Sequence, residues 1–134
     1  MEQAVSETIS AVAALKNIEL MIREKVPERA ASLGQHTIKR LREAQESLNM
    51  IGDVRGLGLM IGVELVKDRR TKKPAVEEAK KVRILAREAG VLVGRGGITG
   101  SVIRVQPPLT ISRELLDRGL DILIEAISKV EKEM

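Results

Sequence analysis

The sequence contains no cysteine and no aromatic residue, and these absences exclude several classes of site. Without cysteine, the chain has no disulfide framework, no thiolate metal site and no thiol nucleophile. Without phenylalanine, tyrosine or tryptophan, it lacks the platforms on which single-stranded nucleic acids stack. We therefore expect no nucleic-acid partner and an aliphatic core. The missing aromatics also fit a thermophilic source, a fragment or an engineered chain.

Long apolar runs are also absent. No run reaches the roughly 18 residues that a membrane-spanning helix needs, so we expect no membrane association. The first residues lack the basic and apolar regions of a signal peptide, so we expect a cytoplasmic location. His36 is the only histidine, and we expect it on the surface of a helix. Since no second ligand lies at metal-binding spacing from His36, we predict no metal site.

What is present is typical of a globular protein. The 134 residues suit a single domain. The hydrophobic share of 43% is that of a folded globular protein and not of a disordered chain. The net charge of +4 arises from 23 basic and 19 acidic residues, which alternate along the sequence. This pattern indicates a mixed, solvated surface rather than a polyanion-binding stripe, although the loop Lys67–Lys73 is rich in cations.

Four segments carry apolar residues at the spacing of an amphipathic helix: 3–24, 27–45, 75–89 and the segment after Ser112. Pro27 is suited to the first turn of the second helix, Gly90 to the C-terminal cap of the third, and Ser112 to the N-cap of the fourth. The middle of the first helix is apolar on nearly every side. Such a helix is expected to have neighbours on more than one side.

Three segments favour strands. Leu57–Leu65 alternates apolar residues with others, Val91–Val93 is a short apolar run, and Val102–Val105 ends at two prolines. We interpret Gly94–Ser101 as a flexible loop. The predicted fold is α+β: a small antiparallel or mixed sheet covered on one face by helices, with a long N-terminal helix.

Arg104 is the candidate binding residue. It lies among the apolar strand residues Val102, Ile103 and Val105, and Pro107 and Pro108 follow directly. A guanidinium is a planar fork that binds a carboxylate through two hydrogen bonds. An internal ion pair is the alternative role. No nucleophile–base pair is visible elsewhere, so we predict no catalytic residue in this chain.

Two segments resemble those of a known family. The first is 51–65, IGDVRGLGLMIGVEL, and the second is 102–111, VIRVQPPLTI. They resemble the segment that opens the C-terminal small domain of class III aminotransferases and the R-x-x-P-P-L segment before the last helix of that domain. The two segments occur in the family's order, and the resemblance extends over most of the chain.

The resemblance implies several roles. Members of this family are pyridoxal-phosphate enzymes that move an amino group from an amino acid or omega-amine to a 2-keto acid. The arginine matching Arg104 binds the substrate carboxylate, and Gly96 and Gly97 would belong to a loop that faces the substrate. The Schiff-base lysine lies in the family's large domain, so we assign no cofactor-binding residue and expect this chain alone to bind no pyridoxal phosphate.

The resemblance also divides the chain. Residues 1–25 would be a linking helix from a missing large domain, and residues 26–134 the small domain. The expected partners are the carboxylate of an amino or keto acid and either that large domain or further copies in a homo-oligomer. A stand-alone interaction or oligomerisation module without catalysis is the alternative, since the helices and the open sheet face would then bury their apolar surface against another chain.

Overall fold

The computed structural model describes residues 2–134, and the side chains of residues 7–134. The chain order begins with helices α1 (Glu2–Arg23) and α2 (Val26–Ser47), followed by strands β1 (Ile51–Leu57), β2 (Met60–Asp68) and β3 (Lys73–Pro74). Helix α3 (Val76–Glu88), strands β4 (Gly94–Gly96) and β5 (Val102–Val105), and helix α4 (Arg113–Lys132) complete the fold. The predicted α+β class is confirmed.

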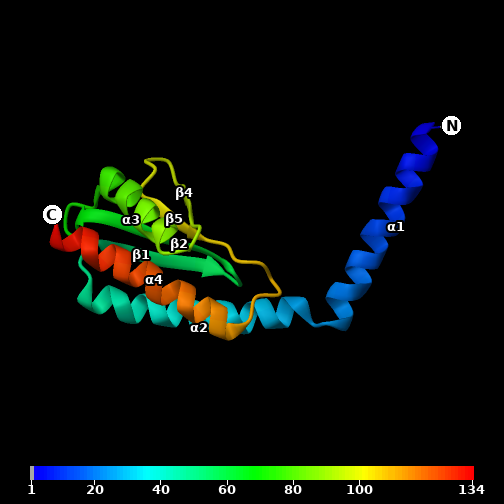
Figure 1. The fold of residues 1–134 in the computed structure, drawn as a ribbon, viewed down its shortest axis with the longest axis horizontal. Coiled ribbons are helices and arrows are strands. Elements are labelled where there is room, and N and C mark those ends of the chain that lie inside the picture. Colours follow the sequence, from blue (N-terminus) through cyan, green and yellow to red (C-terminus); the bar gives the residue numbers. More distant parts are fainter. Residues whose placement is uncertain (1) are drawn as a thin grey trace.

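Within the described residues, the strands pair antiparallel. The sheet order is β1-β2-β5-β4, and the short strand β3 pairs with β2 at its end. In Figure 1, α3 and α4 lie in front of the sheet and α2 runs along its lower side. Alternate strand residues, including Val54, Val63 and Ile103, are buried beneath these helices. The opposite face of the sheet is left open.

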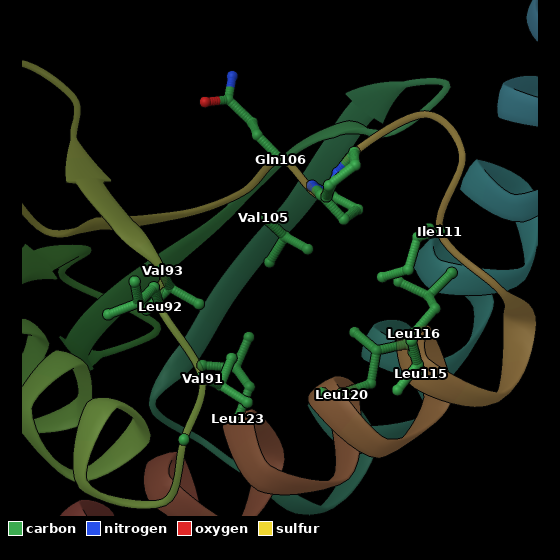
Figure 2. Close-up of a pocket in the computed structure, with 14 residues that line it drawn as sticks. Val91, Leu92, Val93, Val105, Gln106, Ile111, Leu115, Leu116, Leu120 and Leu123 are labelled. Carbon is green, nitrogen blue, oxygen red and sulfur yellow. The ribbon is translucent and has the colours of Figure 1, made fainter.

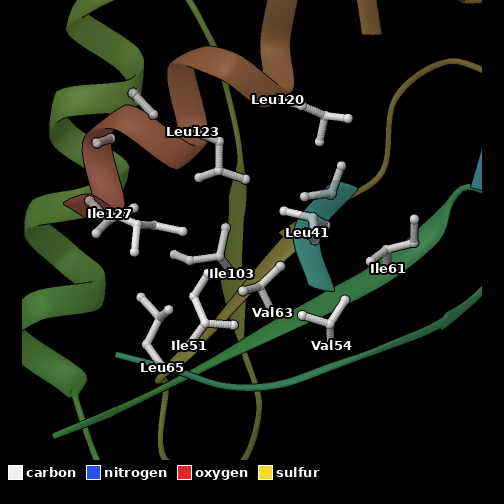
Figure 3. Close-up of a cluster of buried hydrophobic side chains, with 14 of the residues drawn as sticks. Leu41, Ile51, Val54, Ile61, Val63, Leu65, Ile103, Leu120, Leu123 and Ile127 are labelled. Atoms are coloured by element: carbon white, nitrogen blue, oxygen red, sulfur yellow. The ribbon is translucent and has the colours of Figure 1, made fainter. Parts of the chain in front are cut away.

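The core is aliphatic, as the absence of aromatics requires. Figure 3 shows Leu120, Leu123 and Ile127 of α4 projecting toward Ile103 and Val63 of the sheet. Ile103 and Ile127 are completely buried. Burying one such side chain contributes about 1.5–3 kcal/mol, so these contacts between α4 and the sheet are a principal source of stability.

Three predicted helix ends are confirmed. The Ser112 hydroxyl accepts a hydrogen bond from the Leu115 N–H at 3.2 Å, which caps α4. Gly90 follows α3 with φ = 92°, a left-handed conformation that glycine adopts without a steric penalty. Pro27 lies in the first turn of α2, where its missing N–H removes no helical hydrogen bond.

The strand alternation over Leu57–Leu65 is interrupted, because the segment belongs to two strands, β1 and β2. The segment contains a tight hairpin turn, in which Leu57 pairs with Met60 and Gly58 has φ = 54°. Leu57 is consequently 88% exposed. Helix α2 approaches this turn closely, because a Cβ on Gly34 would overlap the carbonyl group of Gly58. The two glycines therefore allow helix and hairpin to meet backbone to backbone.

The short strand predicted at Val91–Val93 is wrong, because these residues lie in neither a helix nor a strand. The next three residues, interpreted as loop, form β4 and pair with β5: Gly94 with Arg104, Arg95 with Ile103 and Gly96 with Val102. The glycines lack intrinsic strand preference. The strand is set by tertiary context, namely its pairing with β5.

Helix α1 projects away from the rest of the molecule (Figure 1). Its apolar side chains in the described part of the helix are largely uncovered, with exposed fractions from 54% to 72%: Ile9, Val12, Leu15, Ile18 and Ile22. Lys25, with φ = 50°, separates α1 from α2 and changes the chain direction.

Candidate functional site

Arg104 stands in the middle of the open sheet face. Its neighbour on β2 is Gly62, and its neighbour on β4 is Gly94. Ile103 and Val105 on either side of it point into the core and are buried. Because side chains alternate along a strand, the Arg104 side chain faces away from the helices and into solvent. Pro107 and Pro108 follow directly, and neither can continue the ladder.

The glycines of β4 make room for this side chain. A Cβ on Gly94 or on Gly96 would stand 3.2 Å from Arg104 Nε. The guanidinium therefore lies across a strand that has no side chains on that face. Any larger residue at either position would displace it. Gly96, a predicted site residue, is thus brought to Arg104, and Gly94, which sequence reasoning placed in a loop, has the same role.

Gly97, the other predicted loop residue, has a different environment. It has φ = 79°, and a Cβ there would stand 2.7 Å from Val102 Cγ2. It ends β4 and turns the chain over Val102, and Arg104 is not among the near neighbours of this Cβ position. We find that Gly97 shapes the loop, whereas Gly94 and Gly96 contact the arginine.

The most informative property of Arg104 is that its charge has no partner within the described residues. Within the described residues it makes no hydrogen bond and no ion pair. Arg55 lies in the same row of the sheet, opposite Gly62. Arg55 Nη1 is 2.6 Å from Asp53 Oδ2 and 2.7 Å from Glu64 Oε2. Hydrogen bonds to Asp53 and then Glu64 raise the pKa of Arg55 above its ordinary value. The internal ion pair considered for Arg104 belongs instead to Arg55.

An apolar hollow adjoins this face at the hairpin tip. Its volume is about 420 Å³, and it is lined by residues that include Leu57, Met60, Gln106 and Leu109. Leu57 and Met60 are 88% and 68% exposed. A ligand held by Arg104 would therefore meet charged residues toward β1 and apolar surface toward the hairpin tip.

A second hollow lies on the other side of the sheet and is separate from Arg104. Its volume is about 290 Å³. It lies between α4 on one side and, on the other side, the segment 90–93 and the C-terminal end of β5. In Figure 2, leucines of α4 and Val105 point into this space, whereas Gln106 points away from it. Because Val105 and Arg104 face opposite sides of β5, a ligand at the arginine would not enter this apolar hollow.

Sequence reasoning missed a charged network between α2 and α4. His36 is not a free surface histidine: its Nε2 donates to Asp117 Oδ1 at 2.5 Å, and Arg113 Nη2 lies 3.2 Å from its Nδ1. Arg40 contacts Asp117 at 3.1 Å and Asp121 at 2.6 Å. His36 and Asp117 are 81 positions apart, so no local pattern could have revealed the pair.

These contacts favour the charged carboxylate. The hydrogen bond from His36, followed by that from Arg40, holds the pKa of Asp117 below its ordinary value. The network joins two helices and lies away from the open sheet face. Its partners satisfy one another, so it is explained as a structural contact.

Two other features, a metal-binding cluster and a membrane-spanning helix, are absent from the described residues. Across residues 7–134, no three histidine, cysteine, aspartate or glutamate side chains are arranged so that they could hold a metal ion. In the described part of the chain, no helix has both the length and the apolar character that crossing a membrane would require.

Comparison with known proteins identifies the family. Residues 5–127 match the family described as aminotransferase class III. The chain belongs to the class III aminotransferase family. The segment that it matches is the C-terminal small domain, as the two motifs predicted.

Relatives and solved structures agree with this assignment. The chain is 48% identical over 128 residues to a leucine/methionine racemase of Thermococcus litoralis, covering 96% of this chain and 28% of that protein. It is 43% identical over 115 residues to a 4-aminobutyrate aminotransferase of Mycobacterium leprae, covering 86% and 26%. The structure of a Bacillus anthracis aminotransferase superposes with a TM-score of 0.81 at 33% identity, covering 87% and 27%. The chain thus spans about a quarter of each relative.

Membership of the family implies pyridoxal phosphate in the whole enzyme, and the residues around Arg104 do not supply the groups that would hold it. The neighbours of Arg104 in its row are Gly62, Gly94 and Arg55, none of which could form a Schiff base. The acids nearest in the adjacent row, Asp53 and Glu64, are engaged by Arg55. The chain has no aromatic ring to stack on the cofactor.

Proposed function

We propose that Arg104 binds the substrate carboxylate of a pyridoxal-phosphate-dependent enzyme of which this chain forms the small domain. The parent reaction would transfer an amino group from an amino acid or omega-amine to a 2-keto acid. In this proposal residues 1–25 link the small domain, residues 26–134, to a large domain that carries the Schiff-base lysine. The observation that best supports this proposal is that the guanidinium of Arg104 lies unpaired over the glycines of β4.

Three features suit Arg104 to this role. Its charge is not neutralised by another described residue, so it is available to an incoming anion. Its strand is held by buried neighbours, which limits the backbone freedom that binding would have to remove. Its fork can form two parallel hydrogen bonds to one carboxylate, which fixes the orientation of the acid as well as its position. The same role would serve racemisation, the activity named for the Thermococcus relative.

A graft tests the assignment. The matching segment of the Thermococcus litoralis racemase would be replaced by this chain, and kcat/KM for L-leucine would be measured for the graft and for its Arg104→Gln and Arg104→Lys variants. We expect Arg104→Gln to lower kcat/KM about 100-fold, since a charged hydrogen-bond pair contributes about 1.5–3 kcal/mol and 1.4 kcal/mol is a factor of ten. The kcat/KM of Arg104→Lys should lie between those of the unchanged graft and Arg104→Gln, because a lysine ammonium keeps the charge but lacks the planar fork of the guanidinium.

Two controls accompany the graft. The inhibition constant of 3-methylbutylamine, which has no carboxylate, should stay within about threefold in every variant, as expected from ΔΔG values below about 0.7 kcal/mol. Arg70→Gln, a change at an exposed loop arginine, should leave kcat/KM unchanged. Equal losses for leucine and the amine, or unchanged activity in Arg104→Gln, would contradict the carboxylate role.

The chain by itself is proposed to be inactive. After incubation with pyridoxal phosphate and gel filtration, we expect no retained cofactor absorbance and no amino-group transfer to a 2-keto acid. Retained absorbance together with turnover that survives further purification would show that this chain contains a cofactor site after all.

A second candidate is an interaction or oligomerisation module without catalysis. The observation that favours it is the uncovered apolar face of α1, from Ile9 to Ile22. Sedimentation equilibrium distinguishes the two roles. The module requires a concentration-dependent oligomer that Ile9→Ser and Leu15→Ser disrupt, whereas a monomer with a cooperative melt would eliminate it.

A further inference from the structure

A basic hollow lies on the face of β4 opposite to Arg104. It has a volume of about 380 Å³, and α3 and β4 line it with Lys80, Arg83, Ile84, Arg87 and Arg95. Gly94 and Gly96 face the arginine of the open sheet face, whereas Arg95 between them faces α3. The hollow is thus independent of the site proposed above.

The cations come from two elements that the fold brings together. Arg83 and Arg87 are four positions apart on α3, and therefore lie on one side of that helix. Arg95 comes from the sheet, and its Nη1 donates to the Gly100 carbonyl at 3.2 Å. Gly100 has φ = 76°, and a Cβ there would stand 3.1 Å from Arg95 Nη1. One guanidinium is therefore held in place while the other two stand beside it.

The charge in this hollow is largely uncompensated. Lys80 pairs with Glu77 at 2.6 Å. Within the described residues, Arg83 and Arg87 have no hydrogen-bond or ion-pair partner, and Arg95 donates to a neutral carbonyl. These arginines carry three positive charges in a chain whose net charge is +4. Like charges at this helical spacing destabilise a helix, so a bound anion would relieve a cost built into the fold.

We propose that this hollow binds a multiply charged phosphate anion, such as a di- or triphosphate. Guanidinium forks match the geometry of phosphate oxygens, and several cations around one hollow favour a ligand with several charges over a single carboxylate. Ile84, 46% exposed, supplies a small apolar surface between the arginines. Because the chain has no aromatic side chain, recognition rests on the phosphates and not on stacking of a nucleobase.

Isothermal titration calorimetry of the purified chain with sodium tripolyphosphate tests the proposal. The variants are Arg83→Ala/Arg87→Ala and, separately, Arg95→Ala. The matched control is Arg70→Ala/Arg118→Ala, which removes the same charge from exposed positions elsewhere. We expect at least a tenfold weaker affinity for Arg83→Ala/Arg87→Ala and a change within threefold for the control. Since both helix positions are exposed, Arg83→Ala/Arg87→Ala should retain the parent circular dichroism and melting temperature.

Further ligands separate the sources of the phosphate. ATP and tripolyphosphate should bind within about threefold of each other if the phosphates alone are recognised, whereas much tighter ATP binding would overturn that part of the proposal. Equal losses in the control and in Arg83→Ala/Arg87→Ala would show nonspecific charge attraction. Absence of binding at millimolar tripolyphosphate, or stronger binding to a 20-base-pair DNA duplex with a steep salt dependence, would also overturn it.

Discussion

Two strands of the open sheet face hold an arginine in the same row, and the two arginines are in opposite states. On β1, Arg55 is engaged by Asp53 and Glu64. On β5, Arg104 stands between Gly62 and Gly94 and has no charged partner within the described residues. Part of the difference is local, because Asp53 lies two residues from Arg55 on the same strand. The other part is the neighbouring strand, which places Glu64 beside Arg55 and Gly62 beside Arg104.

This contrast distinguishes an arginine that stabilises the fold from an arginine that is available to bind a ligand. A cation already matched by acids contributes to the fold and attracts an external carboxylate weakly, because its charge is neutralised nearby. A cation among glycines keeps its charge and its hydrogen-bonding capacity for a ligand.

After the loss of Arg104 itself, the largest effect is expected when Arg104 is given an internal acid. In the graft, Gly62→Glu would place a carboxylate between Arg55 and Arg104, directly across from each, where cross-strand neighbours interact. We expect kcat/KM for leucine to fall about 30-fold, corresponding to about 2 kcal/mol. Gly62→Gln, of similar size but neutral, is the matched control and should fall at most about fivefold, or about 1 kcal/mol. Equal losses in both variants would attribute the effect to size and would break the comparison.

A smaller effect is expected when the space for Arg104 is filled. A Cβ on Gly94 would stand 3.2 Å from Arg104 Nε, so Gly94→Ala should displace the guanidinium by a few tenths of an ångström. We expect a loss of about fivefold in kcat/KM for leucine, or about 1 kcal/mol, without a comparable loss in stability. Gly90→Ala is the contrasting variant. Its Cβ would meet no other atom, but the positive φ of Gly90 is strained for alanine. We therefore expect a lower melting temperature and an unchanged carboxylate affinity of the graft.

Loss of the paired arginine should act on stability instead. Asp53 and Glu64 are direct cross-strand partners, so Arg55→Gln would leave two like charges opposite each other. Since all three side chains are substantially exposed, we expect a destabilisation of only about 0.5–1 kcal/mol, measured by urea denaturation of the isolated chain. High salt should reduce the effect. A variant as stable as the parent at low salt would show that these ion pairs contribute nothing measurable.

The smallest effect concerns the network between α2 and α4. Because the pKa of Asp117 is lowered in the folded state, its contribution is present above the ordinary carboxyl pKa and is lost as the pH falls through the lowered value. Below about pH 5 the parent chain should therefore lose more stability than Asp117→Asn. Denaturation curves at a series of pH values check this. A pH dependence unchanged by Asp117→Asn would mean that His36 and Arg40 do not stabilise the charged carboxylate.

The sequence predicted the helices and their caps well, because their signals are local. The spacing of Leu116, Leu120 and Leu123, and the cap at Ser112, are readable within one segment. The hairpin was missed because the alternation from Leu57 to Leu65 continues across the turn, and a left-handed Gly58 does not interrupt it. Strand β4 was missed because its order comes from pairing with β5, not from strand-forming residues.

The candidate site divides in the same way. Arg104 was found from its strand and from a family motif, both of which are local. Its lack of a partner was not predictable, because the acid that could have paired with it, Glu64, lies on another strand and is engaged by Arg55. The role of Gly94 and the bridging position of His36 depend on contacts between distant segments.

The central claim is that Arg104 is free for a ligand while Arg55 is committed to the fold, and one paired measurement tests it most directly. In the graft, kcat/KM for leucine and urea stability would be measured for Arg104→Gln and Arg55→Gln side by side. We predict about a 100-fold loss of kcat/KM with little loss of stability for Arg104→Gln, and a nearly unchanged kcat/KM with a destabilisation of about 0.5–1 kcal/mol for Arg55→Gln. A large loss of stability in Arg104→Gln, or equal losses of kcat/KM in both variants, would contradict it.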